Sequence, residues 1–139
     1  MKKIISLILA ISCILCLASC SKGPSGELGG LDISIGSARI EKNILDQVVI
    51  IIGTNITNIS DENQDLIYLH TKATQGGKEL KRTYIDEENT TTTLAPGASC
   101  LMEMSFELNT KDEIVKFSVA PPYVRGNVSK EFDPELLLL

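Results

Sequence analysis

Residues 99–108, SCLMEMSFEL, decide the fold class of this chain. Side chains suited to a core recur at every second position: Cys100, Met102, Met104, Phe106 and Leu108. Most positions between them are polar, among them Glu103, Ser105 and Glu107. A period of two is the pattern of a β-strand with one buried face. The stretch therefore predicts a strand that holds Cys100 on the core side, as a buried and unreactive thiol.

The same period extends along most of the chain. Residues 47–58, QVVIIIGTNITN, predict a long strand whose first half is apolar on both faces. In residues 31–40 the apolar set changes parity after Gly36, which predicts a bulge there. Residues 66–73 and 115–119 predict two further strands.

Turn signals separate these strands. Gly76-Gly77 predicts a hairpin turn, after which residues 78–85, KELKRTYI, continue as a strand. The threonines of residues 90–93 suit an edge strand, and Pro96-Gly97 predicts a turn before the strand at 99–108. At the C-terminus we expect Phe132 and part of residues 136–139 to form a final strand. Short strands with turns between them, in one domain over residues 31–139, predict an all-β antiparallel sandwich, with a barrel as the alternative.

The first twenty residues have the layout of a secretory signal. Lys2 and Lys3 precede the uncharged residues 4–19, a run shorter than the roughly 20 apolar residues of a membrane-spanning helix. The stretch Leu17-Ala18-Ser19-Cys20 resembles the lipobox of bacterial lipoproteins. That resemblance implies a signal peptide over residues 1–19, cleavage between Ser19 and Cys20, and a diacylglyceryl group on the Cys20 sulfur. An ordinary secretory signal with an incidental cysteine is the alternative.

Lipidation would place the mature chain on the extracytoplasmic face of the cell membrane. Two acyl chains, for example palmitoyl chains, hold a protein at a bilayer without a transmembrane helix. Residues 20–30 are rich in glycine and serine and predict a flexible linker. Such a linker reaches about 35 Å when extended, so the domain could stand off from the bilayer.

The charge balance excludes one class of partner. The whole chain has 13 basic and 18 acidic residues, and removal of Lys2 and Lys3 would shift its net charge from −5 to −7. A chain this acidic lacks the basic surface that binds nucleic acid.

Three short motifs resemble those of uncharacterised immunoglobulin-like domains of bacterial surface lipoproteins. They are a Thr-Asn strand end at Thr54-Asn55 or Thr57-Asn58, a hairpin at Gln75–Leu80, and the turn at Pro96-Gly97. The resemblance spans about residues 31–120 and implies an immunoglobulin-like sandwich. It implies no catalytic residue, because these motifs mark turns and strand ends.

Candidate sites for chemistry are few in this sequence. His70 falls opposite the apolar side chains of its strand, which predicts an exposed position. Two loops carry carboxylates that could bind calcium, Asp61, Glu62 and Asp65 in one and Asp86, Glu87 and Glu88 in the other. We expect these loops to lie at opposite ends of the sandwich and to bind neither a metal nor a cofactor.

These observations favour a non-enzymatic lipoprotein, used for binding or envelope assembly, with a protein partner in the cell envelope or at a host surface. A sensor or carrier for a small ligand or calcium is the alternative. A hydrolase with an unrecognised site is a third hypothesis, which would require a pocket that contains His70.

Overall fold

The computed structural model describes residues 24–83 and 93–138 of the 139-residue chain. Its strands are β1 (Ser25–Leu28), β2 (Leu31–Lys42), β3 (Val48–Asn58), β4 (Gln64–Asp65), β5 (His70–Gln75), β6 (Lys78–Glu79), β7 (Arg82–Thr83), β8 (Thr93–Leu94), β9 (Ser99–Glu107), β10 (Val115–Ala120) and β11 (Val128–Phe132). A 3-10 turn, η2 (Leu66–Tyr68), precedes β5, and a short helix, α2 (Pro134–Leu137), follows β11. The signal and lipidation predictions for residues 1–19 and Cys20 lie outside the described residues. Within the described part, no helix is long and apolar enough to cross a membrane.

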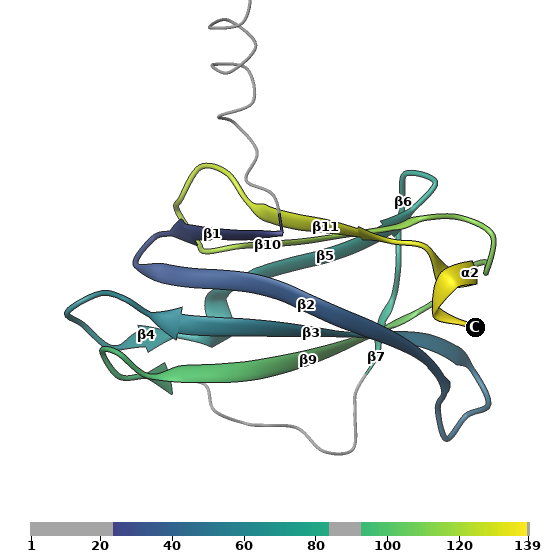
Figure 1. The fold of residues 1–139 in the computed structure, drawn as a ribbon, viewed down its shortest axis with the longest axis horizontal. Helices are drawn as coiled ribbons and strands as arrows, with labels where there is room; N and C mark the ends of the chain where they lie inside the picture. Colours follow the sequence, from purple (N-terminus) through teal and green to yellow (C-terminus); the bar gives the residue numbers. More distant parts are fainter. Residues whose placement is uncertain (1–23, 84–92, 139) are drawn as a thin grey trace, which may run out of the picture.

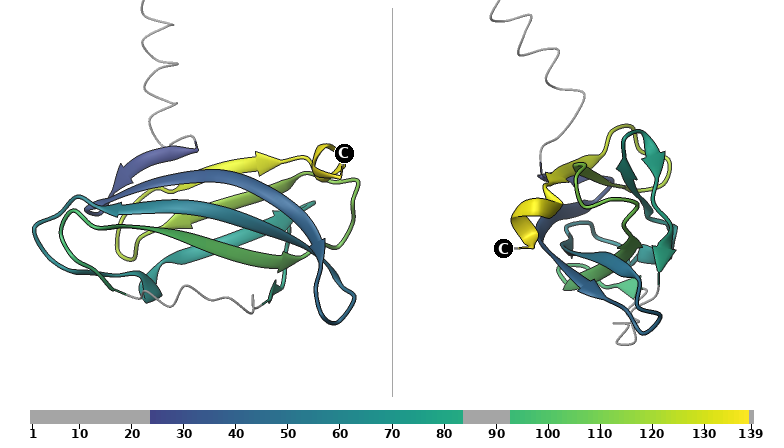
Figure 2. Two further views of the ribbon diagram at one scale, coloured as in Figure 1. Left: turned by 60° about the horizontal axis from the view of Figure 1, so that its bottom comes forward. Right: turned by 90° about the vertical axis from the view of Figure 1, so that its right-hand side faces the viewer.

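Two antiparallel sheets pack face to face (Figures 1 and 2). One has the strand order β1-β2-β3-β9-β7, the other β11-β10-β5-β6, and β4 and β8 form a separate pair. The core between them contains Ile33, Ile50, Ile52 and Met104 from one sheet and Ala73, Phe117 and Val119 from the other. The prediction of an all-β antiparallel immunoglobulin-like sandwich is confirmed.

The ring of Phe106 meets that of Phe117 across the two sheets, with centroids 5.7 Å apart and planes tilted by 59°. The alternation in residues 99–108 therefore does identify the core face of β9. The long strand β3 is buried on both faces at its start, as predicted, because Val49 and Ile51 are as well covered as Ile50 and Ile52.

The predicted bulge in β2 is present. The register between β2 and β3 shifts between Ile35 and Ala38, which leaves Gly36 and Ser37 opposite Gly53. The carbonyl of Gly36 accepts a 2.7 Å hydrogen bond from Lys130 Nζ on β11, so a side chain from the other sheet binds the backbone that the bulge frees. This contact joins the two sheets along the side of the sandwich where β2 and β11 are neighbours.

Thr54 carries a hydroxyl into the core of β3. The side chain is fully buried, and its Oγ1 has no hydrogen-bond partner in the part of the chain that the structure describes. A buried hydroxyl without a partner loses the hydrogen bonds that it makes to water in the unfolded chain.

We therefore expect Thr54→Val to stabilise the domain by about 1 kcal/mol, because the change removes an unsatisfied hydroxyl and keeps the shape of the side chain. Urea unfolding would measure the gain. Thr57→Val on the same strand is the control, since Thr57 Oγ1 lies 2.7 Å from Ser99 Oγ and loses a hydrogen bond. Equal effects of the two substitutions would contradict the prediction.

The prediction of one continuous strand over residues 78–85 is wrong. Lys78 and Glu79 pair with β5, whereas Arg82 and Thr83 pair with β9 in the other sheet. Leu80 lies between the two segments and is buried in the core. The chain crosses from one sheet to the other at this residue. The Gly76-Gly77 turn that precedes the crossing is confirmed, with positive φ at both glycines.

Three other predicted elements differ at their ends. Residues 66–68 form the 3-10 turn η2 instead of the start of a strand, because the Asp65 side chain accepts a hydrogen bond from Ile67 N and caps the turn. Phe132 ends β11 as expected, but Asp133 caps α2 and Pro134 begins it, so Leu136 and Leu137 are helical. The predicted linker, residues 20–30, contains β1, which pairs with β2 over all four of its residues. Pairing to a long neighbouring strand orders a segment that composition alone marks as flexible.

Candidate functional site

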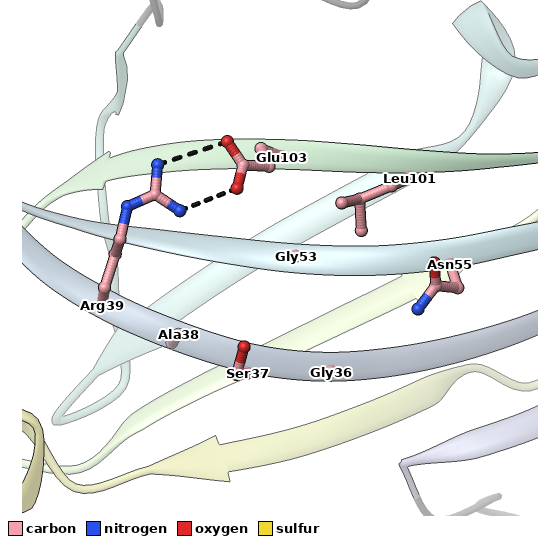
Figure 3. A pocket seen from close by; sticks show the side chains of 8 residues that line it. All are labelled: Gly36, Ser37, Ala38, Arg39, Gly53, Asn55, Leu101 and Glu103. Carbon is pink, nitrogen blue, oxygen red and sulfur yellow. Dashed lines mark hydrogen bonds and ion pairs between the residues drawn. The ribbon is translucent and has the colours of Figure 1, made fainter.

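A groove lies on the outer face of the five-stranded sheet, across β2, β3 and β9 (Figure 3). It encloses about 280 Å³ and is open to solvent. Its lining residues are Gly36, Ser37, Ala38, Arg39, Gly53, Asn55, Leu101 and Glu103. We refer to this feature as the outer groove.

Two glycines create the outer groove, Gly36 at the bulge and Gly53 beside it. Gly53 occupies an outward position in the middle of β3, so the floor of the groove there is bare backbone. A Cβ at Gly53 would lie 3.5 Å from Leu101 Cδ1 and 3.7 Å from the Ser37 carbonyl oxygen, which are ordinary contact distances. A larger side chain at Gly53 would therefore fill the groove without breaking the strand.

An ion pair closes one end of the outer groove. Arg39 donates from Nη1 to Glu103 Oε1 at 2.7 Å and from Nη2 to Oε2 at 3.2 Å, while its Nε donates to Glu41 Oε1 at 2.7 Å. The Arg39 hydrogen bond holds the pKa of the Glu103 carboxyl below its ordinary value, and the two carboxylates raise the pKa of Arg39. Any stability that the pair contributes is present at neutral pH and is lost as the pH falls through the lowered pKa of Glu103.

This arrangement suits recognition of neutral polar groups. The guanidinium is already bound by two carboxylates, so the three charged groups sum to −1 and offer no free cation to an anionic ligand. Both partners remain more than a third exposed, and such surface pairs contribute little to stability. Asn55 and Leu101, at the other end of the groove, supply an exposed amide and an exposed apolar side chain.

A second exposed feature is the hairpin tip, residues 43–47, which joins β2 to β3. Ile44 is 86% exposed and Leu45 71% exposed. The Asn43 side chain orders the tip, because its Oδ1 accepts from Leu45 N and Gln47 N, both at 3.0 Å. The tip thus presents two apolar side chains on a fixed backbone.

The structure places the residues that the sequence singled out for chemistry as follows. His70 is exposed, as predicted. Asp61, Glu62 and Asp65 are exposed too, and the described residues contain no group of three His, Cys, Asp or Glu side chains that could hold a metal ion. Asp86, Glu87 and Glu88 lie outside the described residues, so the expected separation of the two acidic loops remains a prediction.

The motifs that resemble the immunoglobulin-like lipoprotein domains are structural. β3 ends at Asn58, which selects Thr57-Asn58 over Thr54-Asn55 as the strand end. The Asn58 side chain is fully buried and makes four hydrogen bonds, and the buried Gln75 side chain also makes four. Pro96-Gly97 forms the expected turn, with Ala98 N donating to Ala95 O at 3.0 Å.

Cys100 is less buried than predicted. Its thiol faces the core side of β9 as expected, but Cys100 is the second residue of the strand and is only half-buried. Partial burial raises the pKa of the Cys100 thiol, which lowers the fraction of reactive thiolate at neutral pH.

We expect a thiol reagent to label Cys100 in the native protein several-fold more slowly than in denaturant, with a rate that rises as the pH increases. Mass spectrometry of the peptide that contains Cys100 would separate it from the other cysteines. Ser99→Cys in a Cys100→Ala background supplies an exposed thiol one residue away. The prediction fails if the thiols at the two positions react equally fast.

The fold and the outer groove together define an antiparallel β-sandwich domain with a recessed, mainly polar patch on one sheet. The chain belongs to the family described as a domain of unknown function, DUF5067, whose model matches residues 18–120. None of the curated proteins matches the chain.

Two solved structures share this fold. A protein from Bacillus subtilis subsp. subtilis strain 168, described as a putative lipoprotein (ycdA), is 13% identical, with a TM-score of 0.62 over 83% of this chain and 40% of its own. An uncharacterised β-sandwich protein from Clostridium difficile 630 is 14% identical, with a TM-score of 0.61 over 81% of this chain and 94% of its own. The chain thus spans less than half of the Bacillus subtilis structure. Identities this low show a common fold and nothing finer.

The sequence did not single out Arg39, Glu103 or the hairpin tip. Gly53 was the available signal, because it interrupts an apolar run at an outward position. The groove also depends on the pairing of β2 and β9 with β3, which brings Arg39 and Glu103 together from positions 64 residues apart. No local sequence pattern specifies that register.

Proposed function

We propose that this protein is a lipid-anchored, non-enzymatic binding module of the cell envelope, attached to the membrane through Cys20 and displayed on its extracytoplasmic face. The anchor is supported by Leu17-Ala18-Ser19-Cys20, by the charged and then apolar residues before it, and by the description of the Bacillus subtilis structure. The binding role is carried by one observation, the outer groove.

The size of the outer groove favours a protein partner over a free small molecule. Sites for small molecules usually enclose about 300–1,000 Å³ and bury most of their ligand. The outer groove, at about 280 Å³, lies at the lower end of that range, and because it is open to solvent it would leave much of a small ligand exposed. It fits one or two side chains of a partner, held by the Asn55 amide and the Arg39–Glu103 pair.

Palmitate labelling in a lipoprotein-processing bacterium tests the anchor. We expect Cys20→Ala to abolish both the label and the recovery of the protein in the membrane fraction. Cys16→Ala is the matched control, because it changes a cysteine of the signal and leaves the lipobox intact. Persistence of an uncleaved, membrane-bound Cys20→Ala protein would mean that residues 1–19 are a plain anchor.

Site-specific photo-crosslinking tests the binding role. A photoreactive amino acid at Ser37, an exposed lining residue, should give a discrete crosslinked protein in the producing cells, and Gly53→Leu should abolish it by filling the groove. The same group at Lys72, an exposed position on β5 of the other sheet, is the control. The proposal fails if the probe at Ser37 gives no product, or if the probe at Lys72 gives the same product and Gly53→Leu leaves it unchanged.

A further inference from the structure

The chain enters the sandwich by a very short path. Ile35 N donates to Pro24 O at 2.8 Å, which extends the pairing of β1 and β2 to a residue before Ser25. Only residues 21–23 separate Pro24 from Cys20. Four residue steps span at most about 14 Å, less than half the reach of a linker that runs from residue 20 to residue 30.

That length restricts how the domain can sit at a bilayer. The headgroup layer of each leaflet is roughly 5–8 Å thick and takes up about half of the path. β2 alone has 12 residues, or about 40 Å of strand. A domain of this length on so short a tether remains against the membrane, with the side where β1 begins turned towards the headgroups.

The β10–β11 loop, residues 121–127, lies at the upper side of the domain, with β1, in Figure 1 and in the right-hand view of Figure 2, and lies lower than β1 in the left-hand view of Figure 2. It packs on the turn between β1 and β2, since a Cβ at Gly29 would lie 2.8 Å from Val124 Cγ2 and 3.2 Å from Pro121 Cβ. Gly29 follows the end of β1, four residues or about 13 Å along the strand from Ser25. The loop is thus held against the first hairpin of the domain, one strand length from the point of attachment.

Two side chains of this loop suit a membrane surface. Tyr123 is 106% exposed, and its positive φ of 61° is an uncommon conformation for a non-glycine residue. Arg125 is exposed as well. Arg125 is the one charged side chain in this loop, whereas the β1–β2 hairpin that the loop packs against carries the exposed carboxylates Glu27 and Asp32.

We infer that the β10–β11 loop is a membrane-contact site for anionic phospholipid. Tyrosine is enriched at the level of lipid headgroups, where its ring is apolar and its hydroxyl is hydrated. Arg125 lies two residues on and binds lipid phosphate. The inference rests on the proposed membrane attachment and adds to it an orientation: the five-stranded sheet stands on its β1 edge, and the hairpin tip points away from the bilayer.

A single-tryptophan scan tests this orientation, because the natural chain has no tryptophan. Tyr123→Trp, Ile44→Trp and Leu136→Trp place the probe in the loop, at the hairpin tip and on α2, all at exposed sites. Each full-length protein is made in a lipoprotein-processing bacterium and reconstituted into vesicles that contain anionic and brominated phospholipid. We expect about twofold quenching and a blue shift for the indole at position 123, as for an aromatic ring at headgroup level, and neither for the other two probes.

The scan separates failure of the inference from failure of the proposed function. Quenching of the probe at the hairpin tip or on α2 equal to that of the loop probe would overturn the inference, as would a protein that does not bind the vesicles. The mass of the N-terminal peptide reports lipidation of Cys20 on its own. If Cys20 is unmodified and residues 1–19 remain as an anchor, the path to Pro24 is equally short and the scan still decides the orientation.

The charge of Arg125 gives a second measurement. Arg125→Gln should shift the equilibrium between docked and undocked loop by about fivefold on anionic vesicles and leave it unchanged on neutral ones. Arg82→Gln, on the opposite edge strand β7, is the matched control and should change neither. The rate of amide hydrogen exchange in residues 121–127 measures this equilibrium. No tryptophan probe is needed, so Tyr123 is kept. Equal effects of the two substitutions would contradict the inference.

Discussion

Replacement of Asn58 by alanine is expected to destabilise the domain by about 3 kcal/mol, measured by urea unfolding. The Asn58 amide donates to Glu62 O at 2.6 Å and to Leu94 O at 2.9 Å. Its Oδ1 accepts from Ser60 N at 2.9 Å and from Ser60 Oγ at 2.6 Å. The side chain is fully buried, so water cannot replace these bonds without entering the protein.

Asn55→Ala is the matched control for this substitution. Asn55 lies on the same strand and also follows a threonine, but its side chain is exposed, so the loss should stay within about 0.5 kcal/mol. Asn58→Asp tests the two hydrogen bonds that the Asn58 amide nitrogen donates. A carboxylate oxygen in its place would face the carbonyl oxygens of Glu62 and Leu94. The instability of this variant relative to the natural protein should decrease as the pH falls and the carboxyl regains a proton. Similar losses for Asn55→Ala and Asn58→Ala would refute the account.

Gln75→Leu is expected to cost a similar amount, about 3 kcal/mol, since it leaves four backbone groups without their partner. Gln75 Nε2 donates to Thr110 O at 2.8 Å and Glu113 O at 2.9 Å. Gln75 Oε1 accepts from Asn109 N at 3.0 Å and Thr110 N at 3.3 Å. One side chain on β5 therefore holds the connection between β9 and β10 in place.

Gln64→Leu is the control for Gln75→Leu. Gln64 is half-buried, and its amide donates to Ser60 Oγ at 3.1 Å, a bond between side chains near the surface, so a loss below about 1 kcal/mol is expected. Hydrogen exchange of residues 109–113 in Gln75→Leu supplies a second readout, because the amides of Asn109 and Thr110 would become unprotected. Retained protection there would show that other contacts hold the loop.

Alternation was sufficient to predict the strands that form the core. Met104, Phe106, Val115, Phe117 and Val119 are all buried on the expected faces, because burial on one side imposes a period of two on any half-covered strand. The bulge at Gly36 and the turns at Gly76-Gly77 and Pro96-Gly97 were predictable for a related reason. Glycine adopts backbone conformations that other residues avoid, and proline permits few, so both mark places where a strand is interrupted.

The remaining features depend on contacts between segments far apart in the chain. Leu80 could not be identified as the residue at which the chain changes sheets, since its pattern fits one continuous strand. β1 is ordered by its pairing with β2, although its composition is that of a linker. Asn58 and Gln75 were marked by resemblance to other domains, but their role depends partly on distant backbone groups, Leu94 O for Asn58 and the backbone of residues 109–113 for Gln75. The outer groove likewise requires the register of three strands.

β1 also determines how the domain would respond to mechanical load. It is an edge strand of four residues, and Leu28 is the only one of them that is buried. A pull on Cys20 across the strand direction would break the β1–β2 hydrogen bonds one after another, at low force, while β2 to β11 keep their packing. Release of residues 24–28 would lengthen the tether by about 17 Å. Under load, the released segment would therefore lengthen by a fixed amount, and reversibly, before the force acts on the core.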